Sequence, residues 1–401
     1  MKQNVRLLAM VSFFHLFNDG VISLVPLLFP IFRSLFNLSY SQIGIITGTG
    51  LATSLLAQFL IGSISDKRNF RTLLIIGMSL LVISLLLFPS VQGFLSLFLL
   101  FIFLRFSSSF FHPLGIGLIS RRFKKDRLDW AMGIQSAFGD LGVFIAIAST
   151  LFIAETIGLM YPFYIWTFIG LTSIIMGIIL TKTIPKIHLK HHIIKKQITI
   201  TQKINDYKKI ISNLRYFAPM LIISGAIWGT TLTYLPLYLD EKTMLSLSFI
   251  GLFVSLWIGM GTIASVFYGH IQAKIGRKKI ITLSYTTIAC MNVLLIINPT
   301  VLLIPIIVSL LGIATFLTFP ILFSYISEIT HESNEAKTFG YSFTLQLGGG
   351  TVLLYLSGFL SDVFGIWIPF FFMAIASILA TISVFLKSTT SQGSLISNNL
   401  E

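Results

Sequence analysis

The feature that most constrains this chain is a series of long apolar segments, each bounded by charged residues. A helix needs about 20 mainly apolar residues to cross the hydrocarbon core of a bilayer, and twelve segments of this kind occur. Their expected bounds are 5–32, 41–64, 72–89, 94–119, 129–153, 161–181, 216–239, 246–270, 280–297, 300–326, 338–361 and 367–386.

The composition excludes other classes of protein. Apolar residues make up 55% of the 401 residues and charged residues only 10%, whereas soluble domains carry about 25% charge. The single cysteine, Cys290, excludes a disulfide scaffold. The first apolar stretch is too long for a signal peptide, so we expect it to remain as the first membrane helix.

The distribution of Lys and Arg predicts the orientation in the membrane. All but three of the 28 basic residues lie on one side of the expected spans, where the positive-inside rule places the cytoplasm. We therefore expect a multi-pass protein of the cell membrane with both termini cytoplasmic. Anionic lipid facing these loops explains the net charge of +14 without a nucleic-acid partner. The expected cytoplasmic loops are 65–71, 120–128, 182–215, 271–279 and 327–337.

An internal repeat relates the two halves of the chain at a constant offset of 207 residues. LSYSQIG at 38–44 recurs as LSLSFIG at 245–251, and Glu155 and Asp362 share the offset and the sign of charge. With six spans in each half, both halves have the same orientation, as in parallel transporter repeats. We therefore predict an all-α membrane protein with twelve transmembrane helices in two six-helix halves, and a substrate site between them.

The repeat also predicts the domain organisation. The connection between the halves is basic and carries an apolar stripe from Ile200 to Leu214 at helical spacing, which indicates an amphipathic helix at the membrane interface. The Ser/Thr/Asn-rich C-terminal segment is expected to be disordered. The predicted parts are an N-terminal half at 1–181, a basic cytoplasmic linker at 182–215, a C-terminal half at 216–387 and a tail at 388–401.

The loop after the second span carries a family resemblance. It reads GSISDKRNFR from Gly62 to Arg71, and its counterpart in the second half reads GHIQAKIGRK from Gly269. Together with the twelve spans, these loops resemble the major facilitator superfamily. The resemblance implies a conformational latch at the cytoplasmic ends of the helices, formed by Gly62, Asp66, Arg71, Gly269 and Arg277.

Two further stretches point to a subgroup of that superfamily. The first span contains His15 and Asp19 in a His-x-x-x-Asp pair, and the fourth contains Phe-His112-Pro113. This combination resembles the fosmidomycin-resistance family of efflux carriers. The resemblance implies proton-coupled export of a small organic compound, with the first and fourth spans lining the central cavity.

Five ionisable residues fall inside the expected spans away from the span ends, and all five lie in the first half. Each such group costs at least about 2.5–3.5 kcal/mol at the bilayer centre, so such residues usually have a function. At the offset of 207 their counterparts are not ionisable. The five residues are His15, Asp19, Arg105, His112 and Asp140.

Helical spacing predicts how these groups act. His15 and Asp19 are four residues apart and share a helix face, as do Arg105 and His112, seven apart. We hypothesise that Asp19 carries the coupled proton, tuned by His15 and Arg105, with His112 as substrate ligand or relay. The alternative is a static Asp19–Arg105 pair that joins two helices. Asp140 is either a second proton site or a group at a close helix contact.

The second half offers neutral polar and aromatic side chains that suit a mixed apolar and polar ligand. With His112, the expected substrate-binding residues are Gln135, Trp228, Tyr234 and Gln346; the alternative for most of them is helix packing. No phosphate-binding loop of the Walker type is present, so ATP-driven pumping is excluded. We expect no metal and no cofactor.

The sequence therefore predicts a secondary active transporter, and not an enzyme, that works by alternating access. Its partners are a small-molecule substrate, protons and membrane lipids, and we expect a monomer. Export of a drug or other small organic compound by proton antiport is the first interpretation. The alternative is proton-linked uptake of a metabolite or organic anion. A membrane-embedded enzyme or receptor is disfavoured, because the loops are short and no added domain is present.

Overall fold

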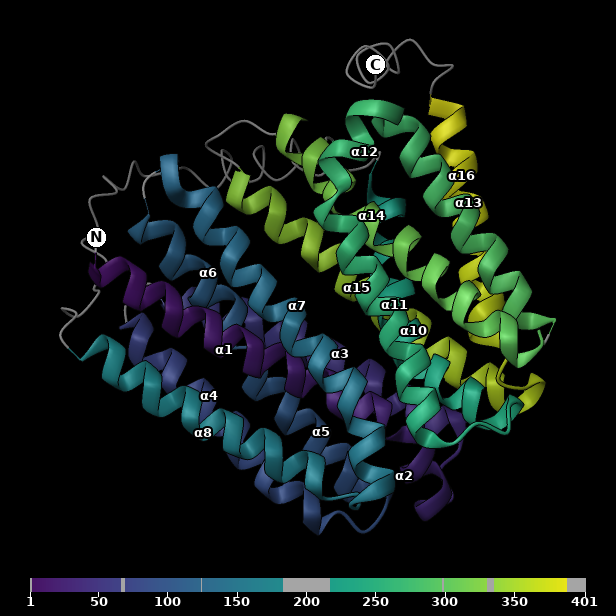
Figure 1. Ribbon diagram of the computed structural model, residues 1–401, viewed down its shortest axis with the longest axis horizontal. Helices are drawn as coiled ribbons and strands as arrows, with labels where there is room; N and C mark the ends of the chain where they lie inside the picture. The colour runs from purple at the N-terminus through teal and green to yellow at the C-terminus, as the bar shows by residue number, and fades with distance from the viewer. Residues whose placement is uncertain are drawn as a thin grey trace, which may run out of the picture. The chain divides into compact units, whose positions relative to one another are not determined.

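The computed structural model describes residues 2–65, 69–123, 125–182, 217–297, 299–329 and 335–387. All regular elements in these ranges are helices (Figure 1). The predicted linker helix and the C-terminal tail lie outside the described residues, as does Asp66.

The first half of the described chain contains eight α-helices and one short 3-10 helix. They are α1 (Lys2–Leu27), α2 (Phe29–Phe36), α3 (Tyr40–Ser65), α4 (Phe70–Leu87), η1 (Phe88–Ser90), α5 (Phe94–Ser108), α6 (Phe111–Arg122), α7 (Lys125–Thr156) and α8 (Tyr161–Thr181).

The second half of the described chain repeats much of this pattern, but α14 is continuous where the first half has α5 and α6. Its elements are α10 (Ala218–Lys242), α11 (Leu247–Val266), α12 (Tyr268–Ile275), α13 (Arg277–Ile296), η2 (Val301–Leu303), α14 (Ile304–Ile329), α15 (Glu335–Phe364) and α16 (Ile368–Lys387).

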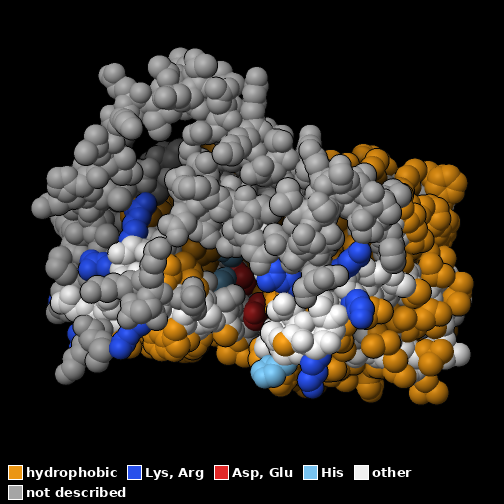
Figure 2. All heavy atoms as spheres, turned by 90° about the horizontal axis from the view of Figure 1, so that it is seen from above, with side chains coloured by type: hydrophobic (Ala, Val, Ile, Leu, Met, Phe, Trp, Pro, Cys, Tyr) orange, Lys and Arg blue, Asp and Glu red, His pale blue; other side chains and the backbone are white. Residues whose placement is uncertain are grey.

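Eleven helical stretches among the described residues are long and apolar enough to cross a membrane, and Ile368–Val384 is a shorter apolar helix that completes the set. The prediction of twelve membrane helices is confirmed. Many large apolar side chains stay exposed, such as Phe59 at 78% and Phe168 at 68%. Figure 2 shows hydrophobic side chains over much of the visible described surface, which is the surface expected to face lipid tails.

Three expected spans are interrupted in the structure. The span expected at 5–32 breaks at Leu28, between Pro26 and Pro30, and continues as α2 to Phe36. Proline has no N–H for the helix ladder and clashes with the carbonyl four residues earlier, so two prolines this close bend the helix. Asn37, with φ of 50°, then ends α2.

The fourth span divides into α5 and α6, and the eighth into α11 and α12. Two of the expected basic loops are also partly helical. Pro113 follows the turn between α5 and α6, where it removes one backbone hydrogen bond. The loops expected at 120–128 and 271–279 are shorter than predicted, because α7 begins at Lys125 and α12 extends to Ile275. Charged residues fit a helix end outside the bilayer as well as they fit a loop, so charge alone did not locate these boundaries.

Helix starts recur at the offset found in the sequence. The starts of α3 and α11, at Tyr40 and Leu247, are separated by 207 residues, as are those of α8 and α16 at Tyr161 and Ile368. Gly158 and Gly365 share the offset as well, and both have positive φ, at 138° and 103°. The internal repeat therefore extends to backbone conformation.

Packing divides the chain into two compact units. One unit comprises residues 1–191 with 244–252, and the other comprises 192–243 with 253–401. The first residues of α11 thus pack with the first unit, where the Glu155 carboxylate accepts hydrogen bonds from the backbone N–H of Ser248, at 2.8 Å, and from its hydroxyl. The domain boundaries expected from the sequence stay a prediction.

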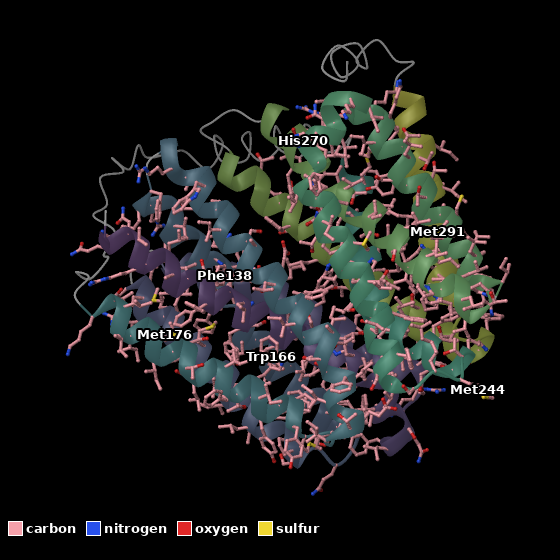
Figure 3. All side chains as sticks on the ribbon, in the orientation of Figure 1. Phe138, Trp166, Met176, Met244, His270 and Met291 are labelled. Carbon is pink, nitrogen blue, oxygen red and sulfur yellow. The ribbon has the colours of Figure 1, made fainter. Side chains whose placement is uncertain are left out.

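Within the first unit, α1 packs against α7 and α8. A Cβ atom on Gly20 would lie 2.0 Å from the Trp166 ring, so this glycine lets the indole press against α1. Trp166, labelled in Figure 3, is only 2% exposed. These contacts fix the register of α1 and therefore the places of His15 and Asp19.

Candidate functional site

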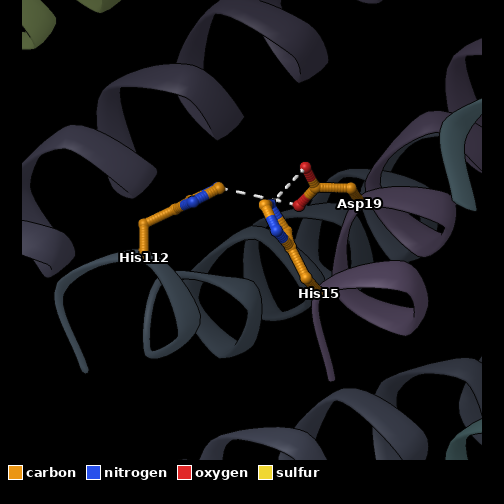
Figure 4. A group of neighbouring side chains, drawn as sticks. All are labelled: His15, Asp19 and His112. Atoms are coloured by element: carbon orange, nitrogen blue, oxygen red, sulfur yellow. Dashed lines mark ion pairs between the residues drawn. The ribbon is translucent and has the colours of Figure 1, made fainter. Parts of the chain in front are cut away.

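Three ionisable side chains meet inside the first unit. His15 and Asp19 lie one turn apart on α1, and their Nε2 and Oδ2 atoms are 3.0 Å apart. His112, near the start of α6, reaches the other carboxylate oxygen of Asp19 from a different helix, at 3.7 Å (Figure 4). The structure thus brings together residues 93 or more positions apart in the chain.

The His15 imidazole has a contact at each of its two nitrogens and on one face of the ring. Its Nδ1 lies 2.7 Å from the backbone carbonyl oxygen of Gln135 on α7. Its ring stacks on Phe111, with centroids 4.5 Å apart and planes at 26°. A carbonyl oxygen only accepts, so Nδ1 carries a hydrogen. The contact between Nε2 and Asp19 therefore contains one further proton, which either group can hold.

Asp19 has a second set of partners on its other oxygen. The side-chain amide of Asn18 donates to Oδ1 at 2.8 Å, and this asparagine is fully buried. The side chains of His15, Asp19 and His112 are 8%, 17% and 34% exposed. Accessibility thus rises from His15 through Asp19 to His112, which makes His112 the member of the cluster most open to solvent or ligand.

Arg105 and Asp140 lie around this cluster without joining it directly. In the described part of the chain, Asp19 forms its ion pairs with the two histidines and not with Arg105. Arg105 is 9% exposed and acts on Asp19 at longer range. Its Nε is buried with no hydrogen-bond partner among the described residues. Asp140 on α7 acts electrostatically on both Asp19 and His15.

Serine hydroxyls compensate for the helix break beside Arg105. The Arg105 carbonyl oxygen accepts from the hydroxyls of Ser109, at 2.6 Å, Ser108, at 3.0 Å, and Ser54, at 3.4 Å. A carbonyl freed by a kink needs such partners in an apolar environment. The kink between α5 and α6 is therefore a stable feature that separates Arg105 from His112.

The same three side chains also have a spacing that a metal ion could bridge. Ligand atoms of His15, Asp19 and His112 all lie within 4.8 Å of one another. Without a metal, Nε2 of His15 and Oδ2 of Asp19 are close enough, at 3.0 Å, to share a proton. The expectation of a metal-free site stays a prediction.

The expected substrate-binding residues are dispersed. Gln135 is buried, and its side-chain oxygen has no hydrogen-bond partner among the described residues. Tyr234 is fully buried, and its hydroxyl donates to the Leu354 carbonyl at 3.0 Å. Gln346 is buried and donates to the Ser224 hydroxyl at 3.3 Å. The half-buried Trp228 lies with its ring centroid 6.4 Å from that of Trp257.

The expected latch residues lie at helix ends. Gly62 lies near the end of α3, where an added Cβ would be 3.8 Å from Pro113. Arg71 donates to the Ile178 carbonyl at 3.3 Å. The guanidinium of Arg277 lies 5.5 Å from the centre of the Tyr325 ring, and Gly269 is exposed in α12.

Sequence reasoning missed Asn18 and Phe111 as partners of the cluster. Both are neighbours of predicted residues, Asp19 and His112. The side-chain amide of Asn18 in an apolar span was a usable signal, because a buried amide needs a partner. Stacking of Phe111 on His15 had no signal in the sequence, since phenylalanine is common in every span.

A family model and one relative match this chain over most of its length, and two further relatives match about a quarter of it. The sequence model of the Major Facilitator Superfamily matches residues 8–245 and 217–398. An uncharacterized MFS-type transporter of Methanocaldococcus jannaschii is 24% identical over 96% of this chain and 98% of its own. The fosmidomycin resistance protein of Escherichia coli is 33% identical over 28% of each chain. An uncharacterized MFS-type transporter of Bacillus subtilis is 28% identical over 27% of each. The chain thus spans about a quarter of the length of these last two relatives.

Solved structures share the fold. A crystal structure of the nucleoside transporter NupG matches with a TM-score of 0.74 at 15% identity, over 98% of this chain and 100% of the other. A bacterial homolog of the human lysosomal transporter Spinster matches with a TM-score of 0.77 at 12% identity, over 96% of each. At these identities the likeness shows the twelve-helix fold alone.

Proposed function

Because this chain belongs to the Major Facilitator Superfamily, a family of membrane transporters and not of enzymes, we propose that it exports a small organic compound in exchange for protons. It does so as a secondary active transporter, by alternating access. The observation that carries the proposal is the cluster of His15, Asp19 and His112 within apolar helices. Ionisable groups in such helices are rare and usually functional.

The hydrogen-bond geometry favours Asp19 as the proton carrier. One proton lies between Asp19 and His15, and the second carboxylate oxygen faces His112. His112 is the most exposed of the three, so it relays protons or contacts substrate. A ligand that takes the place of Asp19 beside His112 changes the charge balance and releases the proton. That exchange couples the flux of protons to the flux of substrate.

The other predicted residues have supporting roles. Arg105 and Asp140 tune the cluster at longer range. Gln135, Trp228, Tyr234 and Gln346 are proposed to line the substrate path; the buried, hydrogen-bonded hydroxyl of Tyr234 favours packing for that residue. Gly62, Asp66, Arg71, Gly269 and Arg277 are proposed as the conformational latch, as the family resemblance implies.

The alternative is proton-linked uptake of a metabolite or organic anion. The buried Nε of Arg105, which lacks a hydrogen-bond partner among the described residues, favours a negatively charged ligand. The cluster serves either direction, because the same proton exchange works in both.

The chain is a multi-pass membrane protein. We propose that it resides in the cell membrane as a monomer with both termini in the cytoplasm, in contact with anionic lipids. Its substrate is a small molecule, it needs no cofactor or metal, and it binds no nucleic acid.

Proton flux in liposomes tests the proposal. Purified protein is reconstituted, a pH gradient is imposed, and internal pH is followed after addition of fosmidomycin, lipophilic cations or organic anions. We expect at least one compound to move protons with wild-type protein. Asp19→Asn removes the titrating group at nearly constant shape, so it should abolish this flux.

A matched control is Glu241→Gln, which makes the same chemical change at the exposed end of α10. It should keep wild-type flux, and an added chelator should leave flux unchanged. Full proton-driven transport by Asp19→Asn would refute the proposal. Solute crossing without any proton movement in the wild type would show an uncoupled facilitator instead.

A further inference from the structure

The His15 ring occupies a recess in α7 that exists because residue 139 is a glycine. A Cβ atom on Gly139 would lie 2.6 Å from Nε2 of His15, 2.7 Å from Cε1 and 2.8 Å from Cδ2. Real Cβ contacts are essentially never shorter than 3.0 Å. Any other residue at 139 therefore pushes the imidazole away from its place.

The missing side chain at residue 139 also gives His15 access to the carbonyl oxygen of Gln135. In an α-helix the N–H of residue 139 bonds to the carbonyl of residue 135, so the side chain of 139 stands beside that oxygen. Without a side chain there, His15 Nδ1 approaches the Gln135 oxygen to 2.7 Å. Phe111 covers the face of the ring, and the imidazole is thereby fixed in position and in tautomer.

The second half lacks this recess. At the repeat offset, Gly139 corresponds to Gln346 and His15 to Ile222. There two other glycines allow the close packing: a Cβ on Gly225 of α10 would lie 2.2 Å from the Gln346 carbonyl oxygen, and a Cβ on Gly349 of α15 would lie 2.5 Å from Cγ2 of Ile222. The glycine that makes room for this side chain is therefore residue 139 in the first half and residue 349, the counterpart of 142, in the second, and only the first half places an ionisable ring there.

We propose that Gly139 is a positioning residue that holds His15 with its Nδ1–H on the Gln135 carbonyl, so that the coupled proton is confined to the Nε2 side, between His15 and Asp19. The inference rests on the proposed proton coupling and deepens it. Because Nδ1 of His15 is bonded to the Gln135 carbonyl, a proton enters and leaves the His15–Asp19 pair through the oxygen of Asp19 that faces His112. His15 is the closed end of the proton path and His112 the open end.

The pH dependence of transport also reflects the other charged groups around His15. Asp19 lies on its own helix, Arg105 comes from α5, His112 from α6 and Asp140 from α7. None of these changes when Gly139 is replaced, so an altered pH profile reports on the placement of His15.

The test compares Gly139→Ala with Gly133→Ala. Both lie on α7, but a Cβ on Gly133 meets nothing within 4 Å. Gly139→Ala removes a hydrogen bond from the imidazolium, so the pH of half-maximal proton-coupled transport should fall by about one unit. Gly133→Ala should keep the wild-type profile. Identical profiles for both variants would overturn the inference.

A double-mutant cycle shows whether Gly139 acts through the ring. His15→Asn shortens the side chain and removes the clash, so adding Gly139→Ala to it should lower neither the thermal stability nor the residual transport further. An equal effect of Gly139→Ala in both backgrounds would contradict the proposal. The cycle stays informative when Gly139→Ala alone fails to fold, because the double variant should then fold as His15→Asn does.

Nitrogen-15 NMR of histidine-labelled wild-type protein tests the tautomer without transport. The His15 signals are assigned from the His15→Asn variant, and Nδ1 should be protonated throughout the pH range in which transport changes. An Nδ1 without hydrogen would overturn the inference. If Asp19→Asn retained transport while Nδ1 proved protonated, the proposed coupling would fail and the placement of His15 would stand.

Discussion

Gly142 of α7 lies directly against the backbone of α1, and its replacement gives a quantitative test of the fold around the site. A Cβ at this position would lie 2.1 Å from the carbonyl oxygen of Leu16 and 2.8 Å from its carbonyl carbon. Ordinary contact begins at 3.4 Å, so Gly142→Ala requires the helices to separate by 1.3 Å, the difference between 3.4 and 2.1 Å. The obstacle is backbone, which has no other rotamer.

The expected loss of stability follows from this displacement. Overpacking costs about 1–3 kcal/mol when side chains can shift, and a backbone contact lies at the upper end. We expect the thermal unfolding midpoint of purified protein in detergent to fall by about 5 °C or more. His15 and Asp19 belong to the same α1, so proton-coupled transport should fall as well.

Gly133→Ala is the control, since the same substitution on the same helix meets no atom within 4 Å. Alanine in place of glycine in a helix stabilises it by about 0.5–1 kcal/mol, so the midpoint should stay constant or rise. The reasoning would be refuted if Gly142→Ala unfolded at the same temperature as Gly133→Ala, or above it.

Three further substitutions test other contacts. Asn18→Ala removes an amide that stabilises the carboxylate form of Asp19, so the pH of half-maximal transport in liposomes should rise by about one unit; a fall would contradict this role. Trp166→Ala leaves a cavity in the first unit and should cost about 3–5 kcal/mol, measured by thermal unfolding. Tyr285→Phe leaves the Met220 carbonyl without its 3.1 Å partner and should cost about 1 kcal/mol. Unchanged midpoints would refute either estimate.

The five ionisable residues of the site all come from the first half of the chain, and their counterparts in the second half are neutral. His15, Arg105, His112 and Asp140 lie around one carboxylate, Asp19. The equivalent places in the second half hold residues such as Ile222, Ala226 and Phe319. A duplicated fold has thus kept its helices while these five ionisable residues stand in one copy, as the proposed proton coupling requires.

The membrane helices could be predicted from the sequence because their cause is local. A run of about 20 apolar residues is stable in lipid only as a helix whose backbone groups bond to each other, and charged residues mark its ends. The repeat offset found in the sequence likewise recurs between the starts of α3 and α11 and between those of α8 and α16. Breaks were harder, because Pro26, Pro30 and Pro113 bend a helix at a place that depends on its neighbours.

The sequence by itself determined which ionisable residues lie in the membrane and that His15 and Asp19 share a helix face. The expectation that Arg105 and His112 also share one was wrong, because α5 ends at Ser108 and His112 belongs to α6. Only the tertiary structure decided their partners: Asp19 pairs with His112 rather than with Arg105, and His15 bonds to a carbonyl of α7. The physical reason is that spacing along one helix fixes contacts within that helix. Contacts between helices depend on how closely two backbones approach, and here glycines at 139 and 142 set that distance.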